Sequence, residues 1–354
     1  MRGSIRTLAA ATAILAAVAM AGCSSTSSSS GSGSTAAAGS GGQLRLGYFP
    51  NLTHAPALVG VGKGYYQDAL DASKTTLKTS TFTAGPDELQ ALLSNSIDAA
   101  FIGPSPTVTG WAQSKGAALK VIAGAAANGA GLVVSKNIKT VADLKGKTIA
   151  SPQLGNTQDI ALRYWLKEQG YATTTSGGGD VHVTPTDNGT ALSELRQGKI
   201  DGAWVPEPYL SEMVAEGGHI LVNEPTTWPG GEFVTTNLVV STSYLKAHPD
   251  QVKELLQGLL KSENFIQSNP TQAKTVVNAA LKKLSGSALD TTVLNAAWKN
   301  VKFTYDPLAS TLKEQAAHAE SLNLLDKVDL NGLYDLGPLN ALLKKQGKSP
   351  VAGL

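Results

Sequence analysis

The feature that most constrains this fold is a segment that occurs twice. Residues 89–101 read LQALLSNSIDAAF, and residues 192–204 read LSELRQGKIDGAW. Each copy predicts an amphipathic helix, a tight turn with an aspartate, and a short strand that ends at proline. A further strand leads each half, at residues 44–49 and 147–150. The chain is therefore predicted to contain two similar α/β halves.

The second copy ends in an abrupt turn. Residues 202–205 read as a buried strand, and Pro206-Glu207-Pro208 follows directly. Proline cannot continue a central ladder, so Trp204 and Glu207 are predicted at the carboxyl end of this strand. Ligands bind at that edge of open α/β sheets. Asp98 and Asp201 precede their strands, at the opposite end, and are interpreted as turn residues.

The remaining pattern continues the α/β alternation up to about residue 240. Further strands are predicted at residues 77–83, 119–123, 131–135, 180–184, 220–222 and 233–240. From Pro249 onward the apolar residues recur at helical spacing, with no second copy. These later helices are predicted to pack on the first half, because the strand at residues 233–240 leads back to it.

The amino terminus has the pattern of an export signal. Arg2 and Arg6 precede an apolar run that is too short to span a bilayer, and the run ends at Cys23, the single cysteine of the chain. This predicts a signal peptide at residues 1–22, a lipid-anchored Cys23 resembling a bacterial lipobox, and a flexible Ser/Gly linker at residues 23–42. The alternative is an ordinary cleaved signal with a chance cysteine.

Composition narrows the function classes. The 354 residues, 42% of them hydrophobic, suit two domains or lobes. Without the two arginines of the predicted signal, the chain has 27 basic and 27 acidic side chains (29 − 2 against 27), so its net charge is zero. Nucleic-acid binding therefore has no electrostatic basis. No cysteine follows Cys23, which excludes disulfides and thiolate metal sites. We expect no cofactor and no metal.

Several motifs together resemble one family. They are residues 47–58 (GYFPNLTHAPAL), 98–103 (DAAFIG), 201–208 (DGAWVPEP) and 228–231 (WPGG). They resemble the substrate-binding proteins of aliphatic sulfonate, taurine and nitrate ABC importers. The resemblance implies an α/β, type II periplasmic-binding-protein fold, with lobe I at residues 43–126 and 237–354 and lobe II at residues 127–236. Two hinge crossovers are implied near residues 124–131 and 235–240.

The candidate ligand-binding residues lie at the predicted strand ends and helix starts. Thr157 and Gln158 open a helix whose free N–H groups favour an anion, unless they form only a plain cap. Each remaining candidate also has a structural explanation: it can cap a helix, pack in the core, or hydrogen-bond between the strands that cross from one half to the other. These remaining candidates are Tyr48, His54, Ser105, Asn128, Trp204 and Thr235.

Glu207 is the exception among the candidates, because a bare anion disfavours a carboxylate nearby. It can pair with an ammonium group on the ligand or with a side chain across the cleft. The ligand is therefore expected to carry an anionic end and a polar or cationic end.

No enzyme motif fits the chain. Gly103-Pro104-Ser105-Pro106-Thr107 departs from the G-x-S-x-G elbow at its last position, and no Walker loop or H-E-x-x-H is present. We predict a monomeric, non-enzymatic lipoprotein on the outer face of the cell membrane that delivers a sulfonate- or taurine-like oxyanion to an ABC permease. The alternatives are a binding protein for nitrate, bicarbonate or a heteroaromatic vitamin precursor, a precursor-biosynthesis enzyme of the same fold, or a sensor.

Overall fold

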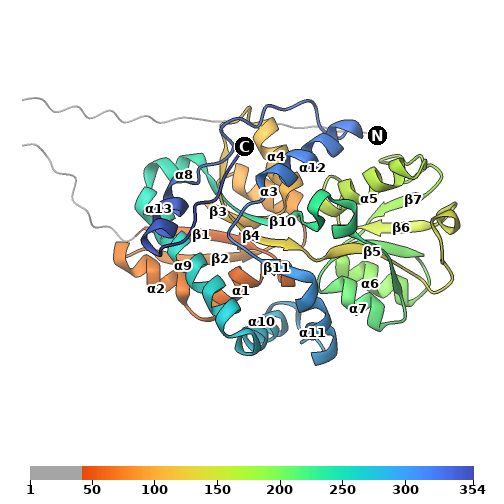
Figure 1. Cartoon of the computed structure of the whole chain (residues 1–354), viewed down its shortest axis with the longest axis horizontal. Coiled ribbons are helices and arrows are strands. Elements are labelled where there is room, and N and C mark those ends of the chain that lie inside the picture. Colours follow the sequence, from red (N-terminus) through yellow and green to blue (C-terminus); the bar gives the residue numbers. More distant parts are fainter. Residues whose placement is uncertain (1–41) are drawn as a thin grey trace, which may run out of the picture. The chain divides into compact units, whose positions relative to one another are not determined.

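The computed structural model describes residues 42–354, which form two mixed sheets flanked by helices (Figure 1). The predicted signal peptide, Cys23 and almost all of the predicted linker lie outside the described residues. The first sheet has the strand order β11-β4-β10-β3-β1-β2, and the second has the order β7-β6-β8-β5-β9. The predicted α/β fold class is confirmed.

The duplicated segment and the strands that precede it form equivalent elements in the two sheets. In the first half these are β1 (Gln43–Tyr48), β2 (Thr76–Thr81), α3 (Gly85–Leu93) and β3 (Ala99–Ile102). In the second half they are β6 (Thr148–Ser151), β7 (His182–Pro185), α6 (Asn188–Arg196) and β8 (Gly202–Pro206). β1 runs parallel to β2 and β3, as β6 does to β7 and β8. The predicted repeat is thus a structural repeat.

The two matching aspartates have the same role. Asp98 accepts hydrogen bonds from the backbone N–H of Arg45, at 2.8 Å, and from its guanidinium group. Asp201 accepts a hydrogen bond from the backbone N–H of Thr148 at 2.9 Å, and Lys147 lies 3.5 Å away. Each aspartate fixes the start of the leading strand of its half. The interpretation of both as turn residues away from the cleft is confirmed.

The chain crosses between the sheets twice. β4 (Leu119–Asn128) belongs to the first sheet and β5 (Ala130–Val134) to the second, so the first crossing occurs at Gly129, where φ is +73°. β9 (His219–Asn223) lies at the edge of the second sheet, and β10 (Val234–Ser241) returns to the first. β10 inserts antiparallel between β3 and β4. Its eight residues are all buried, which explains its β-branched composition.

Helices cover both sheets. Those before the second crossing, besides α3 and α6, are η1 (Leu52–His54), α1 (Ala55–Gly62), α2 (Tyr65–Leu70), η2 (Asp71–Ser73), α4 (Pro104–Gln113), η3 (Val141–Leu144), α5 (Thr157–Glu168), α7 (Tyr209–Ala215), η4 (Glu224–Thr227) and η5 (Pro229–Gly231). After β10 come α8 (Thr242–Ala247), α9 (Pro249–Ser268), α10 (Pro270–Ser285), α11 (Thr291–Asn300), β11 (Val301–Phe303), α12 (Ala309–Ser321) and α13 (Gly337–Lys345). Among the described residues, every helix is too short or too polar to cross a membrane.

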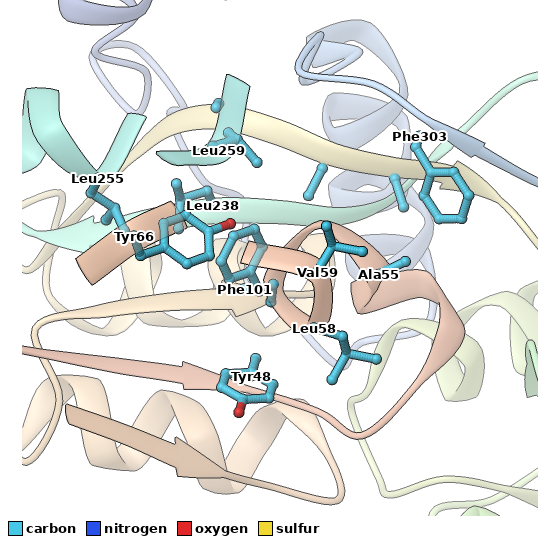
Figure 2. Packing of buried hydrophobic residues seen from close by; sticks show 14 of the residues in the cluster. Tyr48, Ala55, Leu58, Val59, Tyr66, Phe101, Leu238, Leu255, Leu259 and Phe303 are labelled. Carbon is cyan, nitrogen blue, oxygen red and sulfur yellow. The ribbon is translucent and has the colours of Figure 1, made fainter. Parts of the chain in front are cut away.

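The largest core cluster packs α1, α2 and α9 against the first sheet (Figure 2). Tyr66 belongs to this cluster and is fully buried, and its hydroxyl donates a 3.0 Å hydrogen bond to Pro56 O. A Cβ on Gly60 would lie 2.1 Å from the Tyr66 ring, and one on Gly258 would lie 2.4 Å from it. Glycine is therefore required on both helices that enclose this ring. The prediction that the later helices pack on the first half is confirmed for α9 and α10.

The next two helices pack on the first half as well, α11 through Leu294 and Ala297 and α12 against α4 and β10, but they also meet the second half. α11 also packs on α7, and α12 packs on α5, so both reach helices of the second sheet. The apolar pattern predicted helices here but contained no information about which half they would meet.

Candidate functional site

A small cavity lies where the carboxyl ends of strands from both sheets meet several helix starts. It is lined by Phe49, Asn51, Thr53, His54, Thr83, Gly103, Asn156, Thr157, Gln158, Asn188, Pro206 and Thr235. No lysine, arginine, aspartate or glutamate is among these residues. The free volume of the cavity is only about 20 Å³, which is room for one or two waters or one small group.

The start of α5 presents backbone donors to this cavity. The Asn156 side chain accepts the N–H of Thr157 at 2.8 Å, and its carbonyl accepts the N–H of Ile160 at 3.0 Å. The N–H groups of Gln158 and Asp159 have no acceptor among the described residues. Because the helix dipole also places partial positive charge here, this end of α5 favours an anion.

Two buried side-chain oxygens at the cavity lack partners. Thr157 is 3% exposed and its Oγ1 has no hydrogen bond among the described residues. Asn188, at the start of α6, is 8% exposed and its Oδ1 is likewise unpartnered. A Cβ on Gly103 would lie 2.4 Å from Thr157 Oγ1, so only glycine at the end of β3 lets the two halves approach this closely. Burying a polar group without a partner is costly, so these two oxygens are suited to hydrogen-bond a ligand or an ordered water.

His54 supplies a neutral donor. Its Nδ1 accepts the Phe49 N–H at 3.2 Å, which assigns the ring proton to Nε2, and the ring stacks on Phe49 with a centroid separation of 4.4 Å. Nε2 has no hydrogen-bond partner in the part of the chain that the structure describes. Burial lowers the pKa of His54 to about 3, so the ring is uncharged at neutral pH.

The structure brings four of the predicted residues to the cavity: His54, Thr157, Gln158 and Thr235. Thr235 also donates through Oγ1 to Asn128 O. Asn128 does not line the cavity. Its Oδ1 accepts the Phe233 N–H at 3.1 Å, so it serves the crossover ladder, one of the two roles considered for it.

Three other predicted residues point elsewhere. Tyr48 is 3% exposed and belongs to the core cluster of the first sheet (Figure 2). Ser105 Oγ lies 3.5 Å from Gln315 Oε1 on α12. Trp204 is 1% exposed in the core of the second sheet, and its Nε1 donates to Glu224 at 2.6 Å. None of the three lines this cavity. Tyr48 packs in the core, Ser105 does not cap α4, whose N-cap is Gly103, and Trp204 lines a different cavity.

Glu207 also lies outside the cavity lining, contrary to its assignment to the ligand. It is fully buried and accepts hydrogen bonds from Ser211 N at 3.1 Å and Ser211 Oγ at 2.8 Å. Its third donor is Asn300 Nδ2, at 2.6 Å, which comes from α11 across the boundary between the halves. Burial raises the pKa of Glu207, and these hydrogen bonds oppose the rise. The side-chain partner considered for Glu207 is therefore Asn300.

The sequence interpretation missed several lining residues, and the repeat contains a signal for some of them. Leu89 and Leu192 are 103 positions apart (192 − 89). The same offset relates three lining pairs: Thr53 with Asn156, His54 with Thr157, and Gly103 with Pro206. Extending the repeat beyond its helix and strand would have predicted Thr53, Asn156 and Pro206. Asn51, Thr83 and Asn188 have no such counterpart in the lining.

Comparison with known proteins identifies a family model, relatives and solved structures that are similar to this chain. The sequence model of the NMT1-like family matches residues 38–281. A Bacillus subtilis protein named as a candidate aliphatic sulfonates-binding protein is 28% identical over 220 residues, covering 61% of this chain and 62% of that protein. The chain thus spans less than two thirds of the length of this curated relative.

Solved structures share the fold. The alkanesulfonate-binding protein SsuA from Xanthomonas axonopodis pv. citri, bound to MOPS, superposes with a TM-score of 0.67 at 22% identity, covering 82% of this chain and 96% of that one. The periplasmic nitrate-binding protein NrtA from Synechocystis PCC 6803 gives a TM-score of 0.69 at 16% identity, with coverages of 86% and 89%. The two-sheet α/β fold is therefore that of the periplasmic binding proteins, as the resemblance implied.

Proposed function

The chain belongs to the NMT1-like family, and on that premise we propose that it is the substrate-binding component of an ABC importer. Its ligand is a small organic oxyanion with a sulfonate-like head group, held between the two lobes and delivered to the permease. The observation that carries this proposal is the cavity at the start of α5, with free donors, unpartnered buried oxygens and no charged side chain.

A sulfonate suits these donors because it is a permanent anion whose oxygens only accept hydrogen bonds. The N–H groups of Gln158 and Asp159, His54 Nε2 and the Thr157 hydroxyl can all donate to it. A neutral cavity avoids the cost of burying a full positive charge, and the dipole of α5 supplies the attraction. The sulfonate group of MOPS, bound by the SsuA neighbour, is consistent with this choice.

The lining explains how the protein would hold a ligand, because both halves contribute residues to it. His54 and Gly103 come from the first half, while Thr157 and Asn188 come from the second. A ligand touches all of them only when the halves are together, so binding favours the closed arrangement. Since the free space is about 20 Å³, entry of a ligand requires the halves to separate.

The position of Glu207 gives no support for a cationic end on the ligand. Glu207 accepts a hydrogen bond from Asn300 and does not line the cavity. The proposal is therefore limited to the anionic head. A bare anion such as nitrate is the second candidate, because the small free volume accommodates it without rearrangement.

Membrane attachment is proposed from the sequence alone. The predicted signal and Cys23 support an extracytoplasmic lipoprotein held at the outer face of the cell membrane by its lipid, with the monomer as the working unit. The partners proposed are the ligand and the permease subunits.

Thermal unfolding with ethanesulfonate, taurine and nitrate tests the ligand class. A true ligand at 100 times its dissociation constant should add about 2.7 kcal/mol to the free energy of unfolding. If none of these compounds raises the unfolding temperature, the proposed ligand class is wrong.

The Thr157 hydroxyl allows a sharper test by isothermal titration calorimetry. Replacing Thr157 with valine keeps the shape and removes the hydroxyl, which should weaken binding roughly 5- to 100-fold. Ser105→Ala is the matched control, because Ser105 lies outside the lining. Equal affinities of Thr157→Val and the unaltered protein would refute the assigned site.

A further inference from the structure

A second cavity, distinct from the anion site, lies between α5, the end of β8, η4 and α12. Its volume is about 320 Å³, within the range of small-molecule sites. The aromatic residues of its lining are Tyr164, Trp165, Trp204, Trp228 and His318. Trp228 belongs to the Trp-Pro-Gly-Gly motif, which the anion site does not use.

The aromatic rings are organised in two groups. His318 stacks on Tyr164 with centroids 3.6 Å apart and an interplanar angle of 11°, and it lies 5.2 Å from the Trp228 ring. Trp165 and Trp204 form a tilted pair with centroids 5.9 Å apart. Aromatic surface from the second half and from α12 therefore encloses the same space.

The charged groups of this cavity are all acidic. Glu224 is 1% exposed and accepts hydrogen bonds from the indole N–H groups of Trp204, at 2.6 Å, and Trp228, at 3.4 Å. Glu168 on α5 and Glu314 on α12 complete the set, and no lysine or arginine lines the cavity. Burial raises the pKa of Glu224 to about 7 and lowers that of His318 to about 4, so the histidine adds no positive charge at neutral pH.

We propose that this cavity binds a small organic cation of the methylated or quaternary ammonium class. Aromatic faces attract such cations through the ring quadrupole, and the attraction grows when the cation leaves water. A quaternary ammonium has no N–H to satisfy, so an aromatic enclosure with carboxylates suits it better than a hydrogen-bonding site. The cavity at the start of α5 thus favours an anion, whereas this second cavity favours a cation.

Glu224 is the central charge partner in this arrangement. Its two indole donors hold the carboxylate in place. A bound cation favours the ionised carboxyl, so affinity should increase as the pH rises through about 7. The other titratable groups that line the cavity are Glu168, Glu314, Tyr164 and His318. Of these, Tyr164 has a raised pKa and His318 a lowered one, so the phenol and the imidazole both stay neutral over this range.

Choline is the probe, and 3,3-dimethyl-1-butanol is its neutral isostere. By isothermal titration calorimetry with the full chain, choline should bind at least tenfold more tightly than the isostere, and more tightly at pH 8 than at pH 6. Glu224→Gln should weaken choline binding and abolish this pH dependence. Tyr164→Leu and Glu314→Gln, at more exposed positions, test the same site if Glu224→Gln fails to fold.

The control is Glu194→Gln on α6, which lies outside this cavity. It should bind choline as the unaltered protein does. Ethanesulfonate binding should be unchanged in Glu314→Gln, since that residue is absent from the anion site. Equal affinity for choline and the isostere, no choline binding at millimolar concentration, or unchanged choline binding in both Tyr164→Leu and Glu314→Gln would overturn the proposal.

Discussion

Replacing Glu88 with glutamine should make the protein less sensitive to rising pH. Glu88 lies in the first turn of α3, is fully buried, and neither carboxyl oxygen has a hydrogen-bond partner among the described residues. Burial raises its pKa well above the usual 4.5, so the native state holds the proton at pH values where the unfolded chain has lost it. Glutamine has nearly the same shape and does not titrate.

The sign and size of the effect follow from proton linkage. Below about pH 4.5 both states are protonated, and the stability associated with the neutral carboxyl is fully present. Between that pH and the raised native pKa, the native state binds one proton more than the unfolded state. The free energy of unfolding then falls by about 1.4 kcal/mol per pH unit. Glu88→Gln should remove this slope.

Other buried groups also titrate, and comparing the two proteins cancels their contributions. Glu263 and Glu224 have raised pKa values and contribute slopes of the same sign. His54 and His318 have lowered pKa values, so they oppose this trend below about pH 6.5. The difference between Glu88→Gln and the unaltered protein isolates one proton.

Urea unfolding at pH 6, 7 and 8 measures this difference. At each of these pH values that lies below the raised native pKa of Glu88, the stability of Glu88→Gln relative to the unaltered protein should increase by about 1.4 kcal/mol per pH unit. The constant offset is not predicted, because a buried amide without partners has its own cost. Glu194→Gln, half-exposed on α6, is the matched control and should keep the original slope. Parallel stability curves for Glu88→Gln and the unaltered protein would show that Glu88 is ionised in the native state.

The remaining predictions concern the membrane anchor and closure. Cys23→Ser should move the protein from the membrane fraction to the medium, because the lipid would be missing; retention in the membranes would contradict the proposed anchor. Asn300→Ala removes the 2.6 Å hydrogen bond to Glu207 and should favour the open arrangement, at a cost of about 1–3 kcal/mol to the closed one. Small-angle scattering without ligand should then give a larger radius of gyration, and an identical curve would mean that this contact does not hold the halves together.

The repeat allowed most of the strand framework to be predicted. Its offset of 103 positions relates α3 to α6, and the Asp98–Arg45 bond to the Asp201–Thr148 bond. The helix and strand patterns are local and periodic, so they are visible in the sequence, whereas the two aspartate bonds join residues 53 positions apart and were not predicted. The packing of α11 and α12 against the second half was not predictable in this way, because an apolar stripe shows that a face is buried but not what buries it.

The site was predicted less well than the fold for a related reason. Thr157 and Gln158 could be identified because a helix start has free N–H groups whatever surrounds it. Glu207 directly follows β8, as expected, whereas Trp204 lies in the middle of that strand, and the side chain of each turns to a partner distant in sequence, Asn300 or Glu224. Which way a side chain turns depends on such tertiary partners, and the position along a strand does not determine it.

Helices α11 and α12, which have no counterpart in the repeat, influence the equilibrium between the open and closed arrangements of the two halves. Asn300 at the end of α11 bonds Glu207, and on α12 His318 stacks on Tyr164. These contacts join the later helices to the second half. Opening must break them, and the unpartnered Thr157 hydroxyl works in the opposite direction because separation would let water reach it. An anion that satisfies Thr157 removes that tendency to open, so a modest gain in hydrogen bonding at the cavity can control the position of both halves.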